Sequence, residues 1–367
     1  MILNFLKKKS NIFFLSLVLI SVFLEISFRL SPSFSEFYSF KISPLLRLLY
    51  TPISLIPFAV SETLVLTALL LFVSWVVLSV IKPFFIFWKK DFPVKLKALF
   101  FFFVKAGIVV FFLFTATFSS SYHRLDVSNL MGFETVTPDR EKLIVATQKI
   151  SEKLIEISPE IPYTNGRMSS YGTDFKTLSK RLKNSVEKAS EKHPFLKPAG
   201  SLAKPFALSH PMTYTHIAGI YTFFTGEPCI NTNYADYTIP FTMAHEYAHQ
   251  CGIGREDAAD FTAYLICENS SDPYVKYSAF AEVFIILSNE LYALDRDAYY
   301  KILDTLPAVL LNDFILESGE YSKYSDSKAG EIVSSVNDAY LKANGVESGV
   351  KSYRESVVLL VSYLNQN

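Results

Sequence analysis

The stretch that decides the fold runs from Thr242 to Asp260 and reads T-M-A-H-E-Y-A-H-Q-C-G-I-G-R-E-D-A-A-D. His245 and His249 are four residues apart, so on a helix both imidazoles project from the same face, one turn apart. Glu246 would then lie beside an ion held by the two histidines. Zinc in a hydrolytic site takes three protein ligands and one water, and a neighbouring carboxylate can deprotonate that water. The stretch predicts one Zn²⁺ ion, with His245 and His249 as ligands and Glu246 as the catalytic base.

A third ligand is predicted beyond the end of this helix. On a straight helix Glu256 would lie about 10 Å from His249, too far to share a metal ion. Gly252 and Gly254 allow the chain to turn back, because glycine adopts positive φ at little cost and often ends helices. A second helix is expected to follow, with Asp260 one turn after Glu256. We predict Glu256 as the third ligand, and Asp260 as the carboxylate that orients a ligand histidine through its other ring N–H.

With E-x-x-A-D on the second helix, the block is similar to the glutamate-zincin peptidases, including the membrane-bound CAAX-prenyl endopeptidase and heat-shock membrane peptidase group. It more closely resembles an uncharacterised bacterial family with several N-terminal membrane helices and an A-H-E-x-A-H-Q-x-G-x-x-R-E-D-x-A-[ND]-F block, which Ala244 to Phe261 fits. Further matching segments lie within residues 224–233 and 337–353. The resemblance implies a zincin-like fold with His245, His249 and Glu256 on zinc. Only six residues separate His249 from Glu256, so the long insertion of the better-known peptidases is missing.

Three apolar stretches precede the metal block, and each is about long enough to cross a bilayer. They are residues 12–30, 63–81 and 98–118. No small-residue cleavage site precedes Pro32, so the first stretch is predicted to be an anchor and not a removed signal peptide. The predicted fold class is a membrane-anchored α+β protein. Three N-terminal transmembrane helices occupy residues 1–121, and a mostly α-helical zincin-like domain with a small β-hairpin or sheet occupies residues 122–367.

The distribution of charge predicts the orientation. Residues 1–121 carry 12 Lys and Arg against 4 Asp and Glu, and the remainder carries 23 against 31. Lysines gather before the first span and between the second and third, and such basic segments stay in the cytoplasm. Three crossings would place everything after Ser119 outside, so we expect a multi-pass cell-membrane protein with an extracytoplasmic catalytic domain. The acidic soluble part has no basic stripe, which argues against nucleic acid as a partner.

The segment from Met212 to Asn233 is rich in β-branched and aromatic residues around a T-G-E-P turn. This composition predicts a β-hairpin. A strand beside a metal helix can hold an extended peptide by edge pairing, or it can be purely structural. Both interpretations fit the sequence.

An oxyanion formed during hydrolysis would need a hydrogen-bond donor. The candidates are His216, Tyr340 and Tyr353, and for each of them a structural role is the alternative. The three cysteines of the chain are interpreted as small buried residues; they are Cys229, Cys251 and Cys267.

These patterns favour a membrane-anchored zinc metallopeptidase of the HExxH plus Glu type, a hydrolase acting on a peptide or protein substrate. A metal-activated water would attack the peptide bond, with Glu246 as general base. Two alternatives remain open: a non-catalytic membrane receptor or scaffold with a structural metal site, and a zinc amidase acting on cell-wall peptides. Glu246 separates the first alternative from the enzymes, since a structural site has no use for a base beside the metal.

Overall fold

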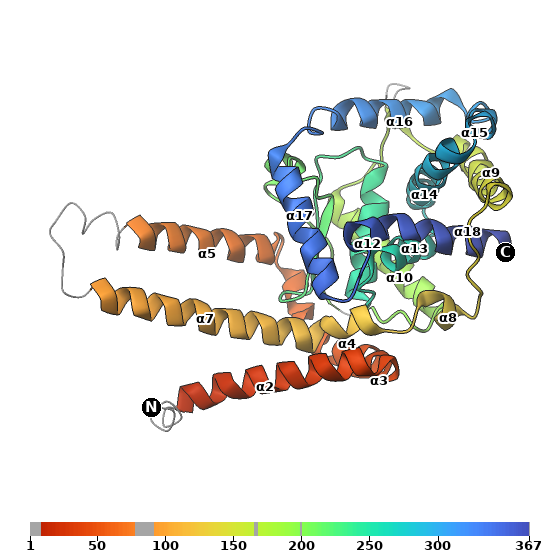
Figure 1. Ribbon diagram of the computed structural model, residues 1–367. Helices are drawn as coiled ribbons and strands as arrows, with labels where there is room; N and C mark the ends of the chain where they lie inside the picture. The colour runs from red at the N-terminus through yellow and green to blue at the C-terminus, as the bar shows by residue number, and fades with distance from the viewer. Residues whose placement is uncertain (1–8, 78–91, 165–167, 199, 367) are drawn as a thin grey trace.

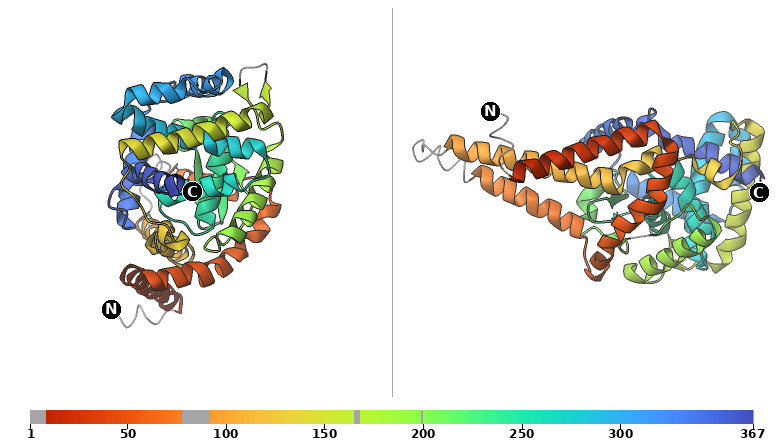
Figure 2. Two further views of the ribbon diagram at one scale, coloured as in Figure 1. Left: turned by 90° about the vertical axis from the view of Figure 1, so that its right-hand side faces the viewer. Right: turned by 90° about the horizontal axis from the view of Figure 1, so that it is seen from below.

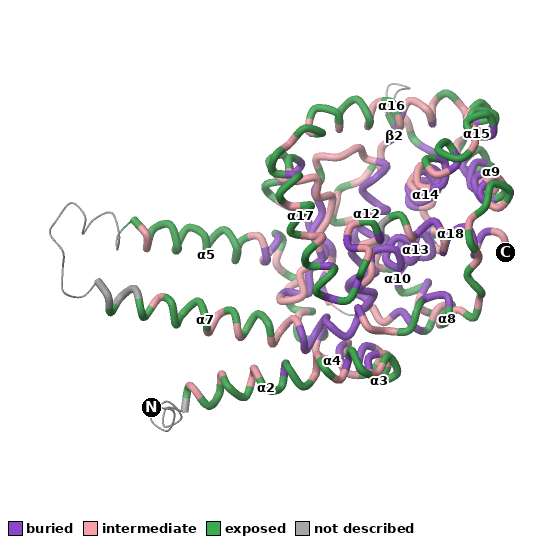
Figure 3. The backbone as a smooth tube through the Cα atoms, viewed as in Figure 1, coloured by how far each residue is buried: buried purple, intermediate pink, exposed green. Residues whose placement is uncertain are grey.

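The computed structural model describes residues 9–77, 92–164, 168–198 and 200–366. The fold is mostly helical with a small sheet, in agreement with the predicted class. Figure 1 shows a helical domain from one side of which long apolar helices project. The side chains of these projecting helices are largely exposed, whereas the centre of the domain is buried (Figure 3).

The projecting helices are α2 (Lys9–Leu30), α5 (Val60–Val76) and α7 (Phe92–Thr117). By length and composition, Ser10–Leu30 and Lys97–Thr117 can each cross a membrane. A third span would require Pro32–Leu55 and Val60–Val76 to act together, although they are bent by 83°. The right view in Figure 2 also shows the helices leaving the domain on one side. The chain therefore has two or three helices suited to a bilayer; the end of the predicted span 63–81 lies outside the described residues.

The segment between α2 and α5 is helical and packs on the domain. It consists of α3 (Pro32–Phe37), the π-helix η1 (Tyr38–Ile42), α4 (Ser43–Arg47) and the 3-10 helix η2 (Leu48–Leu55). The Lys204 ammonium donates to the carbonyl of Ile53 at 2.7 Å, and the backbone N–H of Leu202 donates to Ser54 Oγ at 3.1 Å. These contacts join residues about 150 positions apart in the sequence, and the sequence analysis did not predict them.

The main sheet has the order β3-β5-β4, formed by β3 (Lys204–Pro205), β5 (Glu227–Ile230) and β4 (Gly219–Thr222). β4 and β5 are antiparallel, which confirms the predicted hairpin, and β4 is an edge strand. The prediction is wrong at its start, because Ser209–Thr213 form the short helix α11. A second small sheet pairs β1 (Tyr163–Thr164) with β2 (Met168–Ser169).

Glu227 links the hairpin to the projecting helix α5. Its fully buried carboxylate accepts hydrogen bonds from the backbone N–H groups of Val60 and Ser61, at 3.0 and 2.8 Å, and pairs with Lys204 at 3.0 Å. The first N–H groups of a helix have no partner within the helix, and the helix dipole favours an anion there. The sheet is therefore fixed to the end of α5 that meets the domain.

The centre of the domain consists of α12 (Thr238–Gln250) and α13 (Glu256–Glu268), which pack against each other. Nearly every residue of both helices is buried. Four further helices surround them: α9 (Arg140–Ile157), α10 (Phe175–Lys192), α14 (Pro273–Leu294) and α18 (Ser356–Gln366). The remaining elements are η4 (Ser119–His123), α8 (Val127–Met131), η5 (Ser158–Glu160), α15 (Arg296–Leu303), α16 (Ala308–Tyr321), α17 (Lys328–Ala343) and η6 (Gly349–Glu355).

Candidate metal centre

The turn that ends α12 is a Schellman motif. Gly252 has φ of 86°, its N–H donates to the carbonyl of His249 at 2.9 Å, and the N–H of Ile253 donates to the carbonyl of Ala248 at 3.1 Å. These two bonds satisfy carbonyls that the helix leaves without partners, and the left-handed conformation favours glycine. The chain reverses here, as the sequence predicted.

Gly254 is needed for a different reason, the close approach of another segment. A Cβ atom at this position would lie 2.4 Å from Ser121 Oγ and 2.9 Å from the backbone nitrogen of Tyr122. The segment that follows α7, which includes Ser121 and Tyr122, therefore passes directly against the turn. With the turn held in this way, α13 begins at Glu256 and runs back beside α12.

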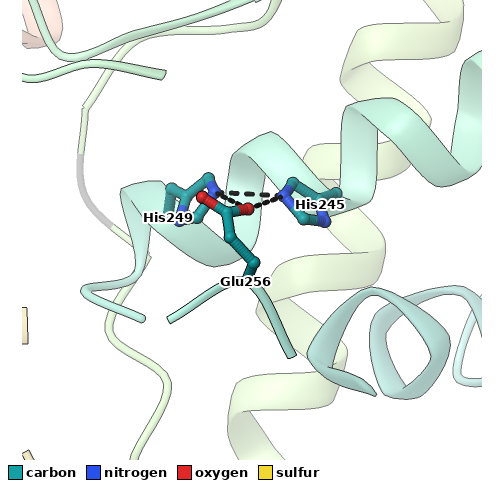
Figure 4. A group of neighbouring side chains, drawn as sticks. All are labelled: His245, His249 and Glu256. Atoms are coloured by element: carbon teal, nitrogen blue, oxygen red, sulfur yellow. Dashed lines mark hydrogen bonds and ion pairs between the residues drawn. The ribbon is translucent and has the colours of Figure 1, made fainter. Parts of the chain in front are cut away.

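His245, His249 and Glu256 come together in a group that could hold a metal ion (Figure 4). The two Nε2 atoms are 3.0 Å apart, and Glu256 Oε2 lies 3.1 Å from Nε2 of His245 and 3.5 Å from Nε2 of His249. Ligand atoms about 2.0–2.1 Å from a tetrahedral zinc ion are separated by roughly 3.3 Å. The spacing of the three atoms fits such an ion.

The other ring nitrogens fix the direction of the lone pairs. His249 Nδ1 lies 2.7 Å from the carbonyl oxygen of Ile253, and His245 Nδ1 lies 2.8 Å from Asp260 Oδ1. A carbonyl and a carboxylate only accept, so both Nδ1 atoms donate. In the neutral rings both Nε2 atoms are then acceptors, and they face each other and the Glu256 carboxylate. Three acceptors that converge on one point suit a shared proton or a metal ion between them.

The electrostatics of the group favour positive charge at its centre. Burial acts to lower the pKa of His245, but its hydrogen bonds with Asp260 and Glu256 raise this pKa well above its usual value. The pKa of His249 is raised as well, because the Glu256 carboxylate outweighs the effect of burial. Burial acts to raise the pKa of Glu256, yet the two imidazoles hold it far below its usual value. A bound metal ion would take the place of the protons that these groups attract.

The side chain of Glu246, on α12, lies against β4. A Cβ atom at Gly219 would lie 2.6 Å from Glu246 Oε1, so only glycine leaves room for this carboxylate. Glu246 is buried, and its Oε2 has no hydrogen-bond partner among the described residues. Burial raises the pKa of Glu246, partly opposed by His249 and His245. The carboxyl group is thus suited to take up a proton.

A cleft of about 840 Å³ opens over these residues, between β4 on one side and α17 on the other. The backbone N–H of Asn231, on the β5 side, donates to the carbonyl of Ala218, on the β4 side. In an antiparallel pair the backbone groups of successive residues face the partner strand alternately, so the N–H and C=O groups of Gly219 and Tyr221 face away from β5. Both residues line the cleft. The outer edge of β4 therefore faces the candidate metal centre, where the backbone N–H of Tyr221 also interacts with the Glu246 carboxylate.

The three candidate oxyanion donors are placed differently. Tyr340 lines the cleft; its oxygen accepts a hydrogen bond from Tyr122 at 3.1 Å, and burial raises its pKa to about 12, so the phenol keeps its own proton. His216 also lines the cleft, but its Nε2 donates to the carbonyl of Tyr324 at 2.7 Å. Tyr353 belongs to η6, and its side chain lies outside the described part of the structure.

Two buried arginines support the end of α12, and sequence reasoning missed both. Arg47 of α4, fully buried, donates from Nη1 to the carbonyl of Gln250. Arg124, which follows α7, donates to the carbonyl of Gly252 at 2.9 Å and forms a two-point ion pair with Glu36. Cations at the C-terminus of a helix are favourable because the helix dipole is negative there. The N-terminal part of the chain thus supports the turn that follows His249.

The three cysteines are free and buried, in agreement with their interpretation as small core residues. Cys251 is the C-cap residue of α12 and is not a member of the ligand group.

The fold and the site define a class: a membrane-helix protein whose helical domain carries a buried two-histidine, one-glutamate group at the base of a cleft. Residues 37–361 match a family model described as "Protein of unknown function (DUF3810)". The chain belongs to this family. A comparison with curated proteins and a comparison with solved structures each gave no match.

Proposed function

We propose that the chain is a membrane-anchored zinc metallopeptidase of the glutamate-zincin type, with its catalytic domain outside the cytoplasm. The observation that carries the proposal is the convergence of three acceptor atoms from His245, His249 and Glu256 at separations of 3.0 to 3.5 Å. Among the described residues this group has three members, and a hydrolytic zinc site likewise has three protein ligands and an open position.

A zinc ion bound there would lower the pKa of a coordinated water and polarise a carbonyl group. Glu246 would accept the proton of that water and pass it to the departing amine, since its raised pKa suits both directions of transfer. Tyr340 would donate its phenolic hydrogen to the carbonyl oxygen as negative charge develops. Asp260 would hold the His245 ring in orientation.

A peptide is favoured as substrate by the outer edge of β4. An extended peptide can pair with the outward backbone groups of Gly219 and the outward carbonyl of Tyr221, which would place one of its carbonyls beside Glu246. This pairing needs no particular side chain, so it suits a peptidase or an amidase acting on short peptide stems. A closed structural site would need neither the cleft nor a buried carboxyl group beside the ligands.

The test compares the purified full chain with Glu246→Gln, both loaded with zinc, on a random peptide library read by mass spectrometry. We expect new peptide N-termini with the wild type, none with Glu246→Gln, and one zinc ion per chain in both proteins. Purified cell wall is a second substrate, and release of stem peptides from it would identify an amidase. If the wild type and Glu246→Gln leave both substrates unchanged while binding zinc equally, the receptor or scaffold alternative replaces the proposal.

A further inference from the structure

The surface of α17 is divided into three faces. One face, which includes Gly330, Val333 and Asn337, lines the cleft. A second face carries the charged side chains of Lys328, Glu331, Asp338 and Lys342. The third carries Ile332, Val336 and Tyr340, at spacings of four residues that align them along the helix. These three side chains are 65%, 65% and 38% exposed, which is unusual for apolar residues that form a continuous row.

The row ends against the membrane helices. The Tyr340 ring packs edge-on against Phe114 of α7, with centroids 6.2 Å apart. The guanidinium of Arg29, in the last turn of α2, donates to the carbonyl of Ala343 at 2.8 Å. In Figure 1, α17 crosses the side of the domain from which α5 and α7 project, and it runs transverse to them. The exposed apolar row therefore continues the apolar surface of the spans along the domain.

We propose that α17 lies in the surface of the bilayer, with Ile332 and Val336 among the lipids, and forms the lip through which substrate enters the cleft. A helix with one apolar and one charged face, lying parallel to the membrane, is typical of interfacial binding. Lipid is favoured over a protein partner because the row is continuous with helices that themselves suit a bilayer. Val336 and Tyr340 belong both to this row and to the lining of the cleft.

The substrate class follows from this position and rests on the proposed function. A cleft with its lip in the membrane surface is reached most readily by a peptide bond a few residues from a lipid or transmembrane anchor. A soluble peptide has no anchor, so the membrane does not raise its concentration near the cleft. The substrate inferred for this site is therefore a membrane-anchored polypeptide, cleaved close to its anchor.

Membrane contact is tested without reference to activity. The full chain is reconstituted in phosphatidylcholine vesicles as Ile332→Cys or Ile315→Cys, each labelled with a fluorophore. Ile315 on α16 is a matched control because it is 68% exposed and lies on a helix that passes over the domain in Figure 1. The three natural cysteines are buried and should remain unlabelled. We expect nitroxide groups near the lipid headgroups to quench the label at position 332 several-fold more than the label at position 315.

Equal quenching at the two positions would overturn the proposal. A second result would also overturn it: a label at position 332 that nitroxide lipid does not quench, and that becomes buried as the protein concentration in detergent rises. A second copy of the chain would then cover the row.

The substrate class is tested with one peptide, prepared with and without an acyl chain. Ile332→Asp should slow cleavage of the acylated peptide about tenfold or more and leave cleavage of the free peptide unchanged, because Ile332 is not part of the cleft lining. An equal effect on both peptides would contradict the inferred class. If the wild type cleaves neither peptide, the proposed function fails, and the quenching result alone still decides whether α17 binds the membrane.

Discussion

His249 Nδ1 donates a hydrogen bond to the carbonyl oxygen of Ile253 at 2.7 Å, inside the turn that ends the helix of His249 itself. The same turn carries the chain back so that Glu256 reaches both histidines. One short segment therefore sets the tautomer of one ligand and the position of another. The metal centre should be sensitive to this turn even at residues that would never touch a metal ion.

Replacement of Gly252 tests that dependence. Gly252→Ala places a side chain at φ of 86° and should lower the free energy of unfolding by about 1–3 kcal/mol, with weaker zinc binding. Gly319→Ala is the control, because a Cβ atom there meets nothing within 4 Å and alanine in a helix should raise stability by about 1 kcal/mol. Thermal unfolding and zinc titration measure both effects. Equal behaviour of the two variants would show that the turn tolerates a side chain.

Asp260 should control zinc affinity through the His245 ring. Asp260→Ala removes the acceptor that lies 2.8 Å from Nδ1, and loss of such a partner typically weakens metal binding about 10–100-fold. Asp257→Asn is a suitable comparison, since Asp257 is also buried at the start of α13 but pairs with Arg255. Competition with a chelator of known affinity gives both constants. An unchanged constant in Asp260→Ala would exclude this role.

Gly219 should be required for turnover and not for metal binding. A methyl group there would displace the Glu246 carboxylate, and loss of a general base typically costs about 10²–10⁴-fold in rate. We expect Gly219→Ala to keep one zinc ion per chain while kcat falls within this range. Adding Glu246→Asp, with its shorter side chain, should restore part of the rate. A Gly219→Ala enzyme of normal activity would refute the close contact.

Zinc affinity should rise with pH. The folded pKa values of His245 and His249 lie above the ordinary histidine value of about 6.5, so their protons stabilise the metal-free fold fully below that pH and stop doing so as pH rises through the folded values. Zinc competes with the same protons, so its binding should release them. Calorimetry in buffers of different ionisation enthalpy counts the protons. Binding without proton release near neutral pH would contradict the raised pKa values.

Tyr340 should act on kcat. Tyr340→Phe removes the phenolic donor and keeps the ring contact with Phe114, and loss of one oxyanion donor typically costs about 10²–10³-fold in kcat. Tyr122→Phe removes the hydrogen bond that Tyr340 accepts and leaves the phenol of Tyr340 in place, so its effect should be smaller. Steady-state kinetics on one peptide separate kcat from KM. A change confined to KM would assign Tyr340 to substrate binding.

The sequence was sufficient where the relevant residues are close together along the chain. The two histidines, the glycine turn and the start of the second helix at Glu256 all follow from local spacing and backbone preference. The β4–β5 hairpin could be predicted for the same reason, because its turn and its β-branched and aromatic residues are contiguous. The small helix at Ser209–Thr213 was missed, since the predicted hairpin began at Met212, where threonine and aromatic residues follow.

Contacts across long separations in sequence could not be predicted. Nothing near Arg47 indicates that it caps α12, which lies about two hundred residues later, and nothing near Gly219 indicates that it makes room for Glu246. Tyr122 lines the cleft only because the chain leaving α7 passes against Gly254. These positions depend on how the helices pack, and that information is not present in any single stretch.

The six residues between His249 and Glu256 act as a fixed spacer. Most of these residues form the turn between α12 and α13, so one inserted or deleted residue would disturb the hydrogen bonds of Gly252 and Ile253 and move Glu256 away from the two histidines. Genomic sequences that share this architecture can therefore be sorted by the length of this interval alone. Those that keep the histidine pair but change the interval should have lost the third ligand or recruited another acid in its place.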